Sequence, residues 1–185
     1  PVGAGTSGQA LDRLLAAVEA ALLSLPKPSI PGTITVDLPA VVIGDTTVRD
    51  VRLSAEPAAG GWTIRSAGAT LPGRTTFEAD GFLGTEGAVD FKGSLLLAVA
   101  QPSGFAAWVA RDIDEAIRKL PAAGFSAKVE LSHSRQVFRD LELVLGNATF
   151  RGEIDSRLPA DAGQTVLVKL DGGALDLDGM AAFAS

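Results

Sequence analysis

The chain has 185 residues, with 22 acidic against 16 basic side chains and a net charge of −6. The Lys and Arg residues are scattered, and only Arg118 and Lys119 are adjacent, so no basic cluster is present to neutralise a run of phosphates, and nucleic acid is not an expected partner. Hydrophobic residues make up 46% of the chain and cysteine is absent, which predicts a folded core without disulfides or thiolate metal sites.

No apolar run approaches the ~20 residues that a membrane-spanning helix requires. The chain begins at Pro1, and no basic segment followed by an apolar one marks a secretion signal. We therefore expect a soluble piece of a longer protein. Any contact with a membrane would be made by parts of the parent that are absent here.

The first expected element is an amphipathic helix. Leucine and valine recur at spacings of three, four and seven over residues 11–25, Ser7 or Thr6 can cap the start, and Pro26 ends the pattern. A leader and this helix would together occupy residues 1–32, ahead of a β-rich domain at residues 33–185.

Strands are expected from residue 33 onward, where apolar and polar residues alternate between glycine and proline turns. The first group of expected strands is 33–38, 46–55, 62–70, 74–82 and 89–99. Short connections of this kind favour an antiparallel meander.

A second helix is expected at residues 103–120, with Phe105, Val109, Ile113 and Ile117 on its apolar face. Further strands are then expected at 125–132, 137–145, 148–154, 165–170 and 174–177. The predicted fold class is α+β and β-dominated: a curved, meandering antiparallel sheet, with the two helices packing on it or capping it.

Two stretches far apart in the sequence share one pattern: Val-Arg-Asp-Val-Arg-Leu at residues 48–53 and Phe-Arg-Asp-Leu-Glu-Leu at residues 138–143. In both, the apolar residue before the Arg-Asp pair is one position out of phase with those after it, which predicts a bulge or bend at the same place. We therefore predict two similar β units, about residues 33–100 and 121–180, joined by the helix at 103–120.

These segments resemble a known family. Phe-Leu-Gly at residues 82–84, Val-Asp-Phe-Lys-Gly at 89–93, the short helix, and then Leu-Gly-Asn-Ala-Thr-Phe-Arg-Gly at 145–152 resemble the AsmA family of Gram-negative envelope proteins. The resemblance covers about residues 33–178. It implies a periplasmic β-rich body, held in the inner membrane by a helix of the parent protein, that takes part in outer-membrane biogenesis. The family is similar to bridge-like lipid-transfer proteins, in which a curved sheet forms an apolar groove.

A groove can also be argued from the residues, because a strictly alternating strand has one apolar face that can hold acyl chains at ~0.8 kcal/mol per buried methylene. The expected ligand is a phospholipid or another acyl chain, and its expected binding residues are Val51, Leu53, Leu141, Leu143 and Leu145. In the alternative, the same faces pack against the two helices. The chain is then an interaction or structural module of an envelope assembly, with protein partners and no bound lipid.

No catalytic constellation, cofactor or metal site is expected. His133 is the only histidine, and it falls in a predicted turn where a surface position is expected. A glycine pattern at residues 3–8 matches a dinucleotide fingerprint but lacks the preceding strand, and the aspartates at residues 171–178 lack the ligand spacing of an EF-hand. We therefore expect a protein that is not an enzyme.

Overall fold

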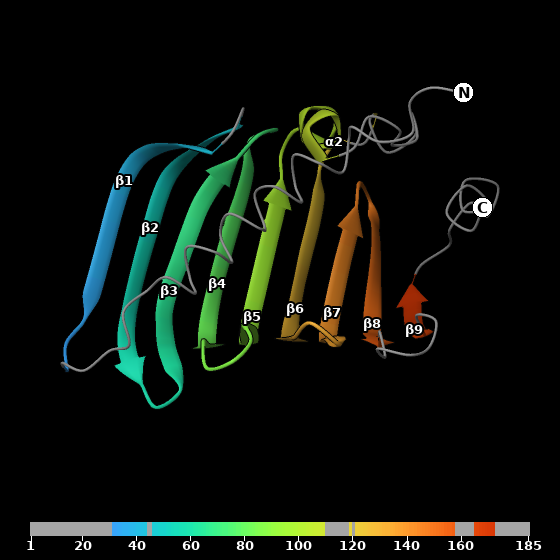
Figure 1. The fold of residues 1–185 in the computed structure, drawn as a ribbon. Coiled ribbons are helices and arrows are strands. Elements are labelled where there is room, and N and C mark those ends of the chain that lie inside the picture. The colour runs from blue at the N-terminus through green and yellow to red at the C-terminus, as the bar shows by residue number, and fades with distance from the viewer. Residues whose placement is uncertain (1–30, 44–45, 110–118, 120, 158–164, 173–185) are drawn as a thin grey trace, which may run out of the picture.

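The computed structural model describes residues 31–43, 46–109, 119, 121–157 and 165–172. Nine strands of this part form one antiparallel sheet, and each strand pairs with its neighbours in the sequence. Figure 1 shows them side by side in a single layer. The strands are β1 (Ile34–Ile43), β2 (Thr46–Ala58), β3 (Gly61–Leu71), β4 (Thr75–Gly84), β5 (Asp90–Val99), β6 (Ala123–Leu131), β7 (Arg135–Leu145), β8 (Ala148–Arg157) and β9 (Thr165–Gly172).

The predicted β-dominated, antiparallel meander is confirmed, and nine of the ten expected strands are found. The tenth, at residues 174–177, lies outside the described residues. The predicted end of the first strand at residue 38 is wrong, because β1 runs through Pro39 to Ile43. Proline lacks a backbone N–H, but a strand at the edge of a sheet tolerates it when the missing donor would face away from the neighbouring strand.

The described residues contain one helix, α2 (Pro102–Val109), and not the two that we expected. The first expected helix lies outside the described residues, as does the second beyond Val109, including Ile113 and Ile117. Within α2, Ala106 is buried and Phe105 is half-buried. The burial predicted for Val109, Ile113 and Ile117 concerns side chains outside the described part and stays a prediction.

The position of α2 is set by its contacts with the end of the sheet. The helix lies at the end of β5 (Figure 1) and not flat on the strands, and it contacts the turn between β3 and β4. The backbone N–H of Gln101 donates to the carbonyl of Gly73 at 2.9 Å. A Cβ on Gly104 would come within 3.0 Å of the Cα of Gly73, so this close contact favours small residues. The indole Nε1 of Trp108 donates to Oγ1 of Thr46 at 2.8 Å, which holds the helix against the start of β2.

The irregularity predicted from the two Arg-Asp pairs is present in both strands. Asp50 in β2 and Asp140 in β7 both have a φ of 50°, in the left-handed region that non-glycine residues rarely adopt. The pairing of β2 with β3 and of β7 with β8 shifts register at these positions. Each bulge brings the strand back into phase, so that the residues on either side of it keep their apolar side chains on one face. The division into units 33–100 and 121–180 stays a prediction.

Candidate apolar binding face

The register assigns the strand residues to two faces, because directly paired residues of antiparallel strands place their side chains on the same side. We call one side the apolar face. One row of cross-strand partners on it runs over six strands, Ala69, Phe77, Leu97, Phe125, Leu143 and Phe150. No Asp, Glu, Lys or Arg of the nine described strands lies on this face.

We call the opposite side the charged face. A row of cross-strand partners there reads Arg52, Gly68, Glu78, Leu96, Ser126, Glu142, Arg151 and Asp171. Ion pairs link neighbouring strands on this side, such as Arg151 with Glu142 at 2.8 Å and Lys169 with Glu153 at 3.0 Å. The strict separation of the two faces follows from the two-residue period of the strands.

Two clusters of buried side chains form the centre of the apolar face. The first consists of Ala55, Trp62, Ile64 and Leu83, and the second of Ala127, Val129 and Leu141. Phe91 is half-buried and packs against both clusters, so it joins them into one continuous surface. The rings of Phe125 and Phe138 meet edge to face, with centroids 5.9 Å apart, which is a favourable geometry for an aromatic pair.

All five of the expected binding residues lie on the apolar face, but in two separate places. Val51 and Leu53 are on β2, and Leu141, Leu143 and Leu145 are on β7. Four strands stand between them, which at the usual strand spacing amounts to about 24 Å. The structure therefore puts these side chains on one face without bringing them together.

The five side chains also differ in burial. Leu141 is only 2% exposed, so it belongs to the core and has almost no surface for a ligand. Val51, Leu53, Leu143 and Leu145 are half-buried and do present surface.

The middle of the face is not among the five expected binding residues. Leu95, Leu97 and Phe125 lie there, between β2 and β7, and are half-buried. All three occupy alternating positions of strands that the sequence did predict. The signal was therefore available, and extending the alternation to every strand would have found them.

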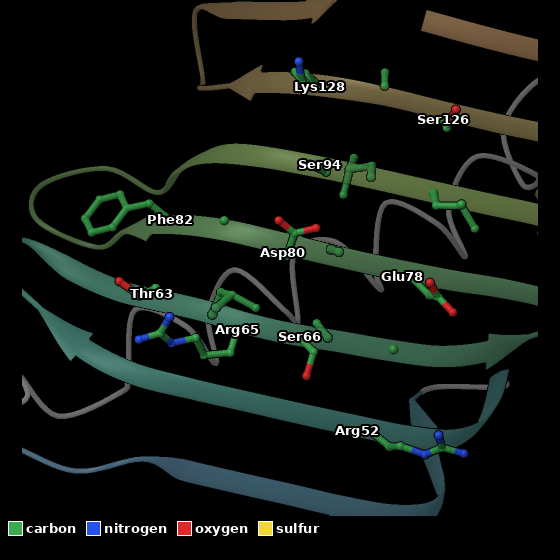
Figure 2. Close-up of a pocket in the computed structure, with 18 of the residues that line it drawn as sticks. Arg52, Thr63, Arg65, Ser66, Glu78, Asp80, Phe82, Ser94, Ser126 and Lys128 are labelled. Carbon is green, nitrogen blue, oxygen red and sulfur yellow. The ribbon is translucent and has the colours of Figure 1, made fainter. Parts of the chain in front are cut away.

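Two hollows of the described sheet lie on the charged face. One of about 1000 Å³ is surrounded by residues of β2 to β7, among them Arg52, Glu78, Asp80, Ser94 and Lys128 (Figure 2). A second, of about 590 Å³, lies over β7 to β9. The expected concave groove thus has no counterpart among these hollows. An acyl chain on the apolar face would lie along a surface of half-buried side chains.

The electrostatics of the charged face are those of structural ion pairs. A hydrogen bond from Arg139 holds the pKa of Glu130 below its usual value, and one from Lys128 does the same for Asp140. His133 is exposed in the turn between β6 and β7, as predicted. In the part of the chain that the structure describes, no group of His, Asp or Glu side chains is arranged to hold a metal ion. Within that part, too, no helix has the length and hydrophobicity to cross a membrane.

The fold and the site together define an open, single-layer antiparallel sheet with one apolar and one charged face. Comparison of the chain with protein-family models, with curated proteins and with solved structures finds no match in any of the three.

Proposed function

We propose that this chain binds acyl chains of phospholipid on its apolar face, as a non-enzymatic periplasmic domain of an AsmA-like protein anchored in the inner membrane. In this role it contributes to lipid transport in outer-membrane biogenesis. The observation that carries the proposal is the apolar face itself, which is free of charged side chains over all nine described strands. At about 4.8 Å per strand, such a surface spans roughly 38 Å.

Burial of an acyl chain gives enough free energy for binding, and no chemical reaction is required. Each methylene removed from water contributes about 0.8 kcal/mol, so fourteen of them amount to roughly 11 kcal/mol before ordering costs. A net value of about −8 kcal/mol corresponds to micromolar affinity. Half-buried side chains such as Leu97 and Phe125 supply the contact surface, and no charged side chain on this face of the described strands has to be desolvated when the acyl chain binds.

The test is the binding of a fluorescent fatty acid, with two variants at neighbouring positions. Leu143 lies on the apolar face, opposite Phe125 and Phe150, whereas the side chain of Val144 points to the other side of the same strand. We expect micromolar binding by the wild type and a loss of at least tenfold in Leu143→Glu. Val144→Glu should bind as the wild type does, and circular dichroism must show both variants folded. Absence of binding by the folded wild type, or equal loss in both variants, would refute the proposal.

A second candidate function is an interaction or scaffold module of an envelope assembly that binds no lipid. The observation that favours it is the burial of the centre of the face, where Val129 and Leu141 are each 2% exposed, as in an ordinary core. Native mass spectrometry after gentle extraction separates the two functions. Bound phospholipid supports the first, and co-purified envelope protein without lipid supports the second.

A further inference from the structure

The exposed large hydrophobic side chains of the described residues are concentrated at the two edges of the sheet. Eight such side chains are exposed, and seven of them are on the edge strands. Those on β1 are Ile34, Leu38 and Val42, and those on β9 are Val166, Leu167, Val168 and Leu170. The eighth, Leu96, is on a central strand, β5. Sheet edges usually carry charge or proline to prevent pairing with other chains, so this distribution is unusual.

The two edges are not equally protected. β1 has Pro39 and Asp37 in its middle, which interrupt the row of backbone donors and add a charge. β9 has no proline, pairs with β8 without a register shift, and has every residue exposed. Its Lys169 is engaged with Glu153 on β8 at 3.0 Å. Among the described residues β9 has no strand on its outer side, so its outer backbone N–H and C=O groups can accept a further strand. The strand expected at residues 174–177, which lies outside the described residues, is the competitor for this edge, and it would keep the wild type monomeric.

We propose that the outer edge of β9 is a dimer interface, at which the β9 strands of two copies of this chain pair antiparallel about a twofold axis at Val168. The axis is perpendicular to the sheet, so the apolar faces of both copies lie on the same side and form one doubled surface. Val168 then lies opposite Val168 of the second copy, and Val166 lies opposite Leu170. On the charged side Leu167 lies opposite Lys169, and Thr165 opposite Asp171, so no two like charges are directly paired.

A second copy fits this edge better through β9 than through β1. Successive strands of the meander alternate in direction, so β1 and β9 run the same way. Joining β9 to β1 of another copy with the faces matched would require parallel pairing, which is less stable per residue, and would leave open ends that add further copies. Pairing β9 with β9 is antiparallel and closed. Its seven residues per strand bury less than the ~1,200 Å² of a standard interface, so we expect a dissociation constant in the micromolar range.

The absence of cysteine allows a direct test by cross-linking. Directly opposed residues of antiparallel strands have Cα atoms about 4.5–5.5 Å apart, within the range that a disulfide spans. We expect Val168→Cys to form a covalent dimer under mild oxidation. Leu96→Cys is the matched control, because it places a cysteine at a similarly exposed position, 41% against 49% for Val168, on a central strand, and it should stay monomeric.

Sedimentation equilibrium measures the same contact without a covalent bond. The wild type should be dimeric at tens of micromolar. Val168→Lys should be monomeric, because it opposes two like charges at the twofold axis, and Leu96→Lys should dimerise as the wild type does. Circular dichroism of both variants confirms the fold. The proposal is overturned if the wild type stays monomeric and Val168→Cys cross-links no more than Leu96→Cys. It is equally overturned if the dimer survives Val168→Lys but is lost in Leu38→Lys, since the interface would then be β1.

Discussion

Removing the side chain of Leu141 tests whether the apolar face is the core of the sheet. Leu141 is 2% exposed and packs with Ala127 and Val129. Leu141→Ala deletes three carbon atoms, which at about 0.8 kcal/mol each is a transfer term of roughly 2.4 kcal/mol. The cavity left in the cluster adds to this, so we expect a total loss of about 3 kcal/mol in the free energy of unfolding.

Leu96→Ala is the matched control, because it removes the same atoms from a side chain that is 41% exposed on the charged face. Part of its surface is already in water and its removal leaves no closed cavity, so about 1 kcal/mol is expected. Urea titrations followed by circular dichroism measure both values, provided that the m-values agree. Losses equal to within about 0.5 kcal/mol would mean that burial on the apolar face does not hold the sheet together.

Three further predictions concern the bulge, the ion pairs and the helix. At the left-handed position 140, Asp140→Val should cost more than about 1 kcal/mol whereas Asp140→Gly should be close to neutral, and equal urea midpoints for the two would contradict a fixed bulge. A hydrogen bond from Arg135 is the main cause that holds the pKa of Asp155 well below its usual value. Asp155 therefore contributes stability above the unfolded-state pKa of about 3.9, and that stability is lost as the pH falls. Asp155→Asn should flatten the decline of the urea midpoint below pH 4, and an unaltered decline would show that the ion pair contributes nothing. Trp108→Phe removes the hydrogen bond to Thr46 and should cost about 1 kcal/mol, measured by thermal unfolding, and an unchanged melting temperature would show that this bond does not anchor α2.

Some elements are predictable from a few neighbouring residues, and others depend on where the strand lies in the sheet. The strand at residues 89–99 was predicted almost as observed, because its alternation and the flanking glycines act over a few residues. The bulge at Asp140 was also foreseen, since the apolar residues on its two sides are out of phase in the sequence itself. The path of β1 through Pro39 was not, because a proline is acceptable or not according to whether the strand lies at an edge.

A meander of alternating strands with one apolar face is predictable from the sequence alone, because the period of two acts within each strand. Tertiary pairing was needed to show that Leu141 is core while Leu143 keeps surface, that four strands stand between β2 and β7, and that β9 is the outermost strand of the described residues on its side of the sheet. These properties depend on strand order and register, which are set by pairing between distant segments. The alternation within any one strand does not determine them.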